Sequence, residues 1–188
     1  MTESKNRQWI LNARPAGKLT GEEFLWNEAP IPRPSDGQVL IRTLWLSVDP
    51  AQRIWMARDS YKSAVPLGDV MQSFAVGQVI ESRHPDSKPG DLVRGDFSWQ
   101  DYVVTDGKAF GGMHKLPPGV PPNLALSLFS INGLTAYFRI TEIGQIKAGE
   151  TVVVSSADAT GSVAGQIAKI KGCRVIGTAG GKEKCDRQ

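Results

Sequence analysis

Residues that could bind a phosphate group lie between positions 151 and 165, in the sequence TVVVSSADATGSVAG. The β-branched run at 151–154 is typical of a short buried strand. Gly161 and Gly165 follow it, four residues apart, where a segment of helical periodicity begins. Because the N–H groups and dipole at the start of a helix attract phosphate groups, the pattern predicts a dinucleotide-binding turn. The residues expected nearest the phosphates are Ala159, Thr160, Gly161 and Ser162.

The motif departs from a full dinucleotide-binding fingerprint, G-x-G-x-x-G, because only two of its glycines are present. The same spacing suits simple contact between a helix and a sheet, so a structural βα turn is the alternative interpretation. Asp158 opposes phosphate binding, since a carboxylate ~4–6 Å from a diphosphate repels it by about 1 kcal/mol or more.

The segments that must position this turn predict a βαβ unit. Gly172 is placed to end the helix, and residues 174–176 start a second strand. A strand, a glycine-bearing turn, a helix and a second strand form half of a dinucleotide-binding fold. The apolar face expected for the helix consists of Val163, Ala164, Ile167, Ala168 and Ile170.

Residues 8–104 contain short apolar segments separated by turns rich in proline and glycine. Closely spaced strands of this kind favour a small β-barrel or sandwich. Residues 49–59 are compatible with a short helix. The strand candidates are residues 9–11, 24–26, 39–48, 74–80, 92–93 and 102–104.

A proline-rich segment at 116–122 marks a boundary, because neither a helix nor a central strand tolerates it. Asn123 is placed to cap a helix that runs to Phe129. The pair Asn132-Gly133 is expected to break this helical pattern, which resumes at residues 134–140.

The composition is that of a globular protein of 188 residues with a net charge of +3. No basic cluster indicates nucleic-acid binding, and no run of 18 apolar residues indicates a membrane span. The two cysteines, Cys173 and Cys185, provide no disulfide framework. We therefore expect a cytoplasmic protein with no nucleic-acid or membrane partner.

Several motifs in the same order resemble the medium-chain dehydrogenase/reductase superfamily. Within it, the chain is similar to the zinc-free branch of prostaglandin reductases (leukotriene B4 12-hydroxydehydrogenases) and alkenal double-bond reductases. The resemblance extends over residues 7–185. The motifs that carry it are VDP at 48–50 with Arg53, DSY at 59–61, GDVM at 68–71, WQDY at 99–102, GLTAYF at 133–138, KAGET at 147–151 and GSVAGQIAK at 161–169.

The resemblance implies an α/β chain with two domains. Residues 7–120 are expected to form a GroES-like β-barrel domain, and residues 121–188 the first βαβ of a Rossmann-type NADP-binding domain. Because family members are much longer, the chain resembles a truncated N-terminal portion. The implied reaction is the NADPH-dependent reduction of the activated C=C bond of small α,β-unsaturated ketones or aldehydes. The short chain itself is expected to be inactive, and a full-length form could be a homodimer.

No metal site is predicted. A catalytic zinc needs clustered Cys and His ligands, whereas both cysteines lie in the βαβ unit and His84 and His114 lie in separate turns. Without a Lewis acid, hydride delivery to a conjugated double bond fits better than alcohol oxidation.

The resemblance also assigns roles to three residues. Tyr61 matches a tyrosine of the substrate pocket, where it could donate a hydrogen bond to an enolate oxygen or pack through its ring. Thr135 matches a residue near the nicotinamide, although its hydroxyl could instead bond its own helix. Lys184 matches a lysine that contacts the 2′-phosphate of NADPH. No residue of the chain is assigned as catalytic.

Two other functions stay open at this point. A quinone reductase of the same superfamily would differ in its substrate pocket and not in the motifs seen here. A non-catalytic truncated protein, retained for binding or dimerisation, is the alternative outside the enzymes.

The cofactor preference rests on the end of the second strand. No acidic residue follows Ile176 at the position where NAD-binding sites hold the ribose, and Lys184 lies beyond it. We therefore predict that, in a full-length form, Lys184→Ala weakens NADPH binding by ~1–3 kcal/mol, the range for a charge-assisted hydrogen bond, and leaves NADH binding nearly unchanged. Calorimetric titration with both cofactors checks this, and equal losses would show that Lys184 does not contact the 2′-phosphate.

Overall fold

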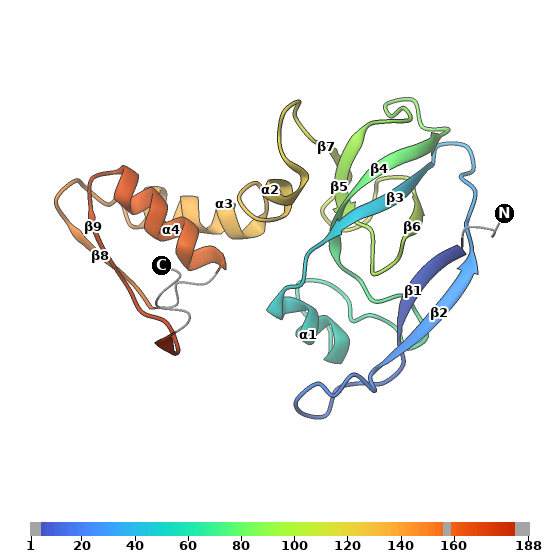
Figure 1. Cartoon of the computed structure of the whole chain (residues 1–188), viewed down its shortest axis with the longest axis horizontal. Coiled ribbons are helices and arrows are strands. Elements are labelled where there is room, and N and C mark those ends of the chain that lie inside the picture. The colour runs from blue at the N-terminus through green and yellow to red at the C-terminus, as the bar shows by residue number, and fades with distance from the viewer. Residues whose placement is uncertain (1–4, 156–158, 183–188) are drawn as a thin grey trace. The chain divides into compact units, whose positions relative to one another are not determined.

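The computed structural model of the chain describes residues 5–155 and 159–182 (Figure 1). The chain divides into two compact units, Met1–Asn123 and Leu124–Gln188. The finer domain bounds expected from the sequence, 7–120 and 121–188, stay predictions. No helix in the described ranges is both long and apolar enough to cross a membrane.

The core of the first unit is a five-stranded antiparallel sheet in the order β6-β3-β4-β5-β7. Its inner face buries one apolar cluster, made of Val39, Ile41, Ala75, Val79, Val93 and Phe97. The strands are β3 (Val39–Leu46), β4 (Phe74–Ser82), β5 (Leu92–Asp96), β6 (Tyr102–Thr105) and β7 (His114–Lys115). All four strands predicted in this region form, and β7, which was not predicted, is a fifth.

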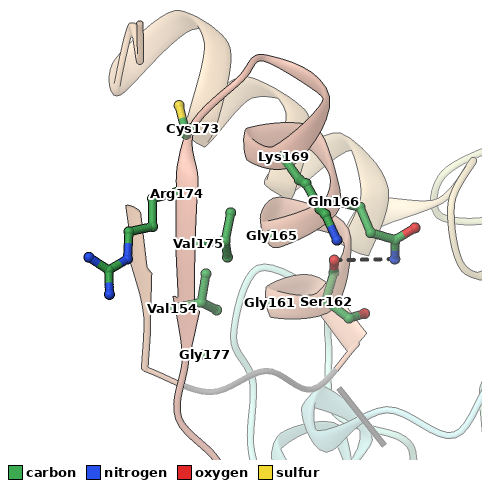
Figure 2. Close-up of a pocket in the computed structure, with 10 residues that line it drawn as sticks. All are labelled: Val154, Gly161, Ser162, Gly165, Gln166, Lys169, Cys173, Arg174, Val175 and Gly177. Atoms are coloured by element: carbon green, nitrogen blue, oxygen red, sulfur yellow. Dashed lines mark hydrogen bonds between the residues drawn. The ribbon is translucent and has the colours of Figure 1, made fainter. Parts of the chain in front are cut away.

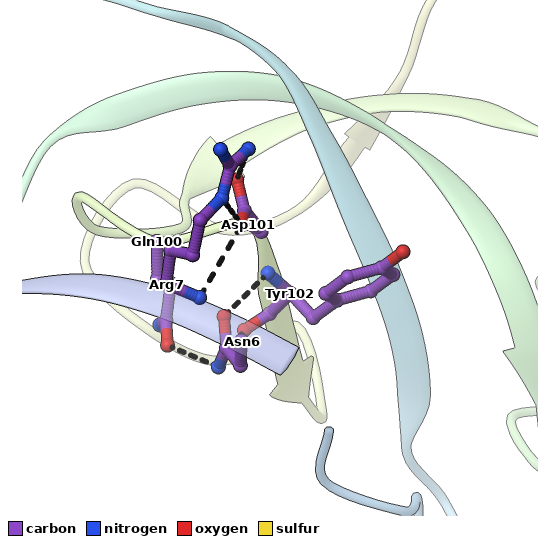
Figure 3. A network of polar contacts seen from close by, with 5 residues as sticks. All are labelled: Asn6, Arg7, Gln100, Asp101 and Tyr102. Atoms are coloured by element: carbon purple, nitrogen blue, oxygen red, sulfur yellow. Dashed lines mark hydrogen bonds and ion pairs between the residues drawn. The ribbon is translucent and has the colours of Figure 1, made fainter. Parts of the chain in front are cut away.

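The remaining predicted strands, β1 (Lys5–Leu11) and β2 (Phe24–Pro30), form an antiparallel pair. A buried amide connects this pair to the larger sheet: Asn6 Nδ2 donates to the Tyr102 carbonyl at 2.8 Å, and the Tyr102 N–H donates to Asn6 Oδ1 at 2.9 Å (Figure 3). Beside it, Arg7 Nε lies 2.5 Å from Asp101 Oδ2. Because the Asn6 side chain is buried, both the oxygen and the NH2 group of its amide need hydrogen-bond partners.

The short helix expected within residues 49–59 is α1 (Pro50–Ala57). Its start is favourable, with a proline in the first turn and Gln52 Oε1 accepting from the Asp49 N–H at 3.3 Å. Trp55 and Met56 face inward and complete a second apolar cluster with Leu11, Val65 and Met71. The first unit thus contains two packed cores, one under the sheet and one under the helix.

The second unit contains the predicted βαβ arrangement. Strands β8 (Thr151–Val154) and β9 (Arg174–Gly177) are parallel, and α4 (Ala159–Ile170) connects them across one face. The face away from α4 leaves Val153 63% and Ile176 39% exposed. Before this arrangement come α2 (Pro122–Leu126), α3 (Ile131–Phe138) and a π-helical turn, Arg139–Ile143.

Two expectations about the helices before β8 are wrong. Asn123 does not cap α2, because the helix already begins at Pro122. Nor does Asn132-Gly133 break the pattern: the interruption lies earlier, where the Ser130 hydroxyl donates to the Leu126 carbonyl at 2.6 Å, and α3 contains both residues. Gly133 permits this, since a Cβ there would lie 1.7 Å from the Leu128 oxygen.

The end of α4 forms as predicted at Gly172, which has φ +82°. The Cys173 N–H donates to the Ala168 carbonyl and the Gly172 N–H to the Lys169 carbonyl, both at 3.0 Å, which is a Schellman motif. The predicted apolar face is correct for the buried Ala168 and wrong for Ile170, which is 85% exposed in the last turn. Helical periodicity placed Ile170 on the edge of that face, where no described neighbour covers it.

The two helical glycines differ in a way that stability measurements can test. We expect Gly133→Ala to destabilise the second unit by roughly 1–3 kcal/mol or more, because its Cβ would overlap backbone at Leu128. At Gly165 the nearest atom to an added Cβ is Val175 Cγ1 at 3.4 Å, an ordinary contact. Gly165→Ala should therefore gain up to about 1 kcal/mol of helix propensity. Equal melting temperatures of the two variants by circular dichroism would contradict this reading.

The acid sensitivity of the first unit depends in part on Asp91. The Lys115 ammonium, 2.7 Å away, and the Lys88 N–H lower the pKa of the Asp91 carboxyl below its usual 3.8. The carboxylate therefore contributes stability above about pH 4 that is lost as the pH falls through the lower, folded-state pKa. In Asp91→Asn this contribution is absent, so the difference in melting temperature from the parent should be constant above pH 4 and shrink below it. A difference independent of pH would contradict the assignment.

Candidate functional site

A groove of about 600 Å³ runs between α4 and β9 in the second unit (Figure 2). It begins near Cys173, where β9 starts, and opens where β9 ends at Gly177. The lining residues are Val154, Gly161, Ser162, Gly165, Gln166, Lys169, Cys173, Arg174, Val175 and Gly177.

The open end of the groove is where the strand ends and the helix start come together. The parallel register pairs Val154 with Gly177, so both strands end at the same level. Figure 2 shows Gly161 and Ser162, in the first described turn of α4, next to these two ends. Neither Gly161 nor Gly177 carries a side chain, which leaves room for a ligand between helix and strand. This is the arrangement in which a helix start binds phosphate.

Contacts between α4 and the two strands, and one hydrogen bond of Cys173, form the sides of the groove. Val154 and Val175 point toward α4, and Gly165 lies opposite Val175, where an added Cβ would be 3.4 Å from Val175 Cγ1. At the far end the Cys173 Sγ donates to the Lys147 carbonyl at 3.2 Å. Cys173 is buried and packs as a small core residue.

The predicted phosphate-turn residues do not all take part in the same way. Gly161 and Ser162 line the groove, whereas Ala159 begins the helix and accepts a 3.0 Å hydrogen bond from the Ser162 hydroxyl. Thr160 is used structurally: its hydroxyl donates to Asn132 Oδ1 at 3.0 Å and so ties α4 to α3. Thr135 is exposed on α3 and does not line the groove.

The charged residues that line the groove are Lys169 and Arg174, and none of its lining residues is acidic. The Arg174 side chain points away from α4, whereas Lys169 extends from the helix (Figure 2). Among the described lining residues Lys169 is therefore the cation on the side of α4, and a cation with no carboxylate beside it favours an anionic ligand. Asp158 and Lys184, whose charges entered the sequence predictions, both lie outside the described residues.

Tyr61 lies in the first unit, after α1. Its ring makes an edge contact with Trp55 at 6.1 Å between centroids and a tilted contact with Phe110 at 5.8 Å. It is nevertheless 58% exposed. The ring therefore packs on one side, as one of the two sequence interpretations has it, and the residue still presents a surface to solvent, while its hydrogen bond to an enolate stays a prediction.

One pair of residues near Tyr61 was not predicted. Lys62 Nζ forms an ion pair with Asp96 Oδ2, and each side chain is only 7% exposed. The two residues are 34 positions apart, and neither belongs to a motif, so no sequence signal pointed to them.

Within the described ranges, no group of three or more His, Cys, Asp or Glu side chains is arranged to hold a metal ion. His114 Nε2 contacts the Gly111 carbonyl at 2.8 Å, and the His84 Nδ1 accepts from the Asp86 N–H at 3.1 Å. His84 thus serves a loop contact, whereas His114, expected in a turn, lies in β7 and pairs with β5.

A β unit with one short helix is followed along the chain by a parallel βαβ with a glycine near the helix start, which is the arrangement of half of a dinucleotide-binding fold. Residues 7–112 match a family described as the N-terminal domain of oxidoreductase. The chain belongs to this family, in the zinc-free branch of the medium-chain dehydrogenases/reductases.

Two curated relatives are an NADPH-dependent curcumin reductase of Escherichia coli K12 and prostaglandin reductase 1 of Oryctolagus cuniculus. The first is 43% identical over 97% of this chain and 53% of its own length. The second is 38% identical over 99% of this chain and 52% of its own length. The chain thus spans about half the length of these curated relatives.

A solved structure, CurA of Vibrio vulnificus in complex with NADPH, superposes with a TM-score of 0.86 at 41% identity. The superposition covers 96% of this chain and 53% of the CurA chain. These matches confirm the predicted fold class: a GroES-like domain followed by the start of a Rossmann-type domain.

Proposed function

We propose that this chain takes part in the NADPH-dependent reduction of the activated C=C bond of α,β-unsaturated ketones or aldehydes. The observation that carries the proposal is the groove at Gly161 and Ser162, which opens where β8 and β9 end together. It is supported by the 43% identity to an NADPH-dependent curcumin reductase. Because the chain spans about half of that relative, the activity is proposed for a protein of the relative's length.

The described residues fit a dinucleotide at the start of α4. The side-chain-free Gly161 lets the backbone approach a pyrophosphate, and the helix dipole favours its charge. Lys169 adds positive charge along the same groove. NADP is favoured over NAD because no acidic residue follows β9 through residue 182, and because Lys184 matches the 2′-phosphate position.

When bound, NADPH supplies the hydride for the reaction. The task left to the protein is to orient the substrate and to stabilise the enolate that forms. Tyr61 suits this role, because an exposed phenol supported on one side by Trp55 and Phe110 can donate a hydrogen bond to an enolate oxygen. Thr135 is proposed to lie near the nicotinamide.

The 188-residue chain by itself is proposed to bind NADPH weakly and to turn over no enone. Among the described residues, the face of the β8–β9 pair away from α4 leaves Val153 and Ile176 exposed. A homodimer is proposed for a protein of full relative length. A cytoplasmic location agrees with Cys173, which is a free thiol.

The binding part of the proposal is tested by placing a negative charge at the helix start. Ser162→Glu should weaken NADPH binding by about fivefold or more, because a carboxylate about 4 Å from a phosphate repels it by at least ~1 kcal/mol. It should leave α4 intact, since an acidic residue is favourable in the first turn of a helix. Calorimetry measures the dissociation constant, and circular dichroism measures the helix.

Gln166→Glu is the matched control, because it places the same charge on the same groove one helical turn further from the phosphate position. Its effect should be several-fold smaller. Equal effects of the two variants, or an unchanged dissociation constant in Ser162→Glu, would contradict cofactor binding at the start of α4. Consumption of NADPH with trans-3-nonen-2-one, followed for this chain and for the full-length form of the protein, tests the reaction itself.

A further inference from the structure

The ion pair between Lys62 and Asp96 lies at the junction of four separate segments of the first unit. Lys62 follows α1 in the loop before β4, and Asp96 is the last residue of β5. The Lys62 ammonium faces the rings of Trp55 at 4.6 Å, Phe110 at 5.6 Å and Phe74 at 6.0 Å. We call Lys62, Asp96 and these three rings the lysine cage.

The cage compensates a charge that would otherwise be costly to bury. Both side chains of the ion pair are 7% exposed, so each has lost almost all of its hydration. The Asp96 carboxylate and the faces of three aromatic rings replace the water around the ammonium. Two polar atoms of the cage are not compensated: Asp96 Oδ1 and Trp55 Nε1 are buried without a hydrogen-bond partner among the described residues.

The same rings also support Tyr61. It makes aromatic contacts with Trp55 and Phe110, and the Lys62 ammonium lies over both of these rings. Tyr61 is adjacent to Lys62 in the chain, and the Ser60 N–H donates to the Lys62 carbonyl at 2.9 Å. Anchoring Lys62 to β5 therefore fixes both the backbone that carries Tyr61 and the surface on which its ring rests.

We propose that Lys62 and Asp96 are positioning residues: their buried ion pair holds the ring of Tyr61 in place at the proposed substrate surface. Neither residue needs to touch the substrate. The role in substrate binding rests on the proposed function, whereas the control of the Tyr61 ring position does not.

Fluorine NMR of the chain labelled with 3-fluorotyrosine gives a local measurement. The sequence contains three tyrosines, Tyr61, Tyr102 and Tyr137, and the Tyr61 signal is assigned by its loss in Tyr61→Phe. In Lys62→Met the Tyr61 signal should move toward the position of free tyrosine or split, while the Tyr102 signal stays in place. An unmoved Tyr61 signal would overturn the proposal.

Lys115→Met is the matched control, because Lys115 also pairs with an aspartate of the first unit, Asp91, but is half exposed and has no ring contact in the part of the chain that the structure describes. It should leave the Tyr61 signal unchanged. A shift of that signal equal to the shift in Lys62→Met would mean a general structural response and would overturn the proposal.

If Lys62→Met leaves Asp96 unpaired and does not fold, the double variant Lys62→Met with Asp96→Leu keeps the experiment decisive. Replacing a buried ion pair by apolar residues of similar volume is commonly neutral or stabilising. The Tyr61 signal should still be displaced in this folded variant, and a parental position there would show that packing alone holds the ring.

Titration with trans-3-nonen-2-one then separates the two claims. In the parent chain, adding the enone should shift the Tyr61 signal. In the variant whose Tyr61 signal is displaced, the same shift should need several-fold more enone. If the parent signal does not respond to the enone, the proposed substrate surface fails. The displacement of Tyr61 by the substitutions alone still decides whether the ion pair positions it.

Discussion

Parallel pairing of β8 and β9 is the constraint on which the second unit depends. Two parallel strands cannot be joined by a tight turn, so a helix must carry the chain back along the sheet before the second strand begins. This connection places the start of α4 at the same end as the last residues of both strands, Val154 and Gly177. The groove is therefore a result of topology, and Gly161 needs only to keep it free of side chains.

The sequence was most informative where the local pattern and the tertiary contacts agree. The apolar segments of the first unit are separated by turns rich in proline and glycine, and β1 and β5 alternate in burial along their length, so the strand positions could be predicted within a few residues. The same holds for α4 and its end at Gly172. Prediction from the sequence failed for β7, because His114 and Lys115 are both polar and pair with β5 without any apolar pattern. It also failed at Gly133, where a close approach to Leu128 makes a helix-breaking residue necessary inside a helix.

In the candidate site, too, the features set by local sequence could be predicted and those set by tertiary contacts could not. Glycine spacing located Gly161 and Ser162 in the groove, because that spacing reflects backbone geometry. It did not reveal that Thr160 is committed to Asn132, a residue 28 positions earlier. Nor did it reveal the lysine cage, in which an ammonium, a carboxylate and three rings meet from distant segments. Contacts of this kind are set by the tertiary fold, and no periodicity in the chain encodes them.

The groove between α4 and β9 has a thermodynamic consequence. Its walls are the same helix and strands that make up the second unit, so a ligand bound there acts as part of that unit's packing. Binding and folding of the second unit are then linked by mass action, and each tenfold excess of ligand over its dissociation constant adds about 1.4 kcal/mol to the stability of the folded form. The first unit has two apolar cores of its own, so this binding free energy does not contribute to its stability. The cellular concentration of the ligand would thus set how much of the second unit is folded.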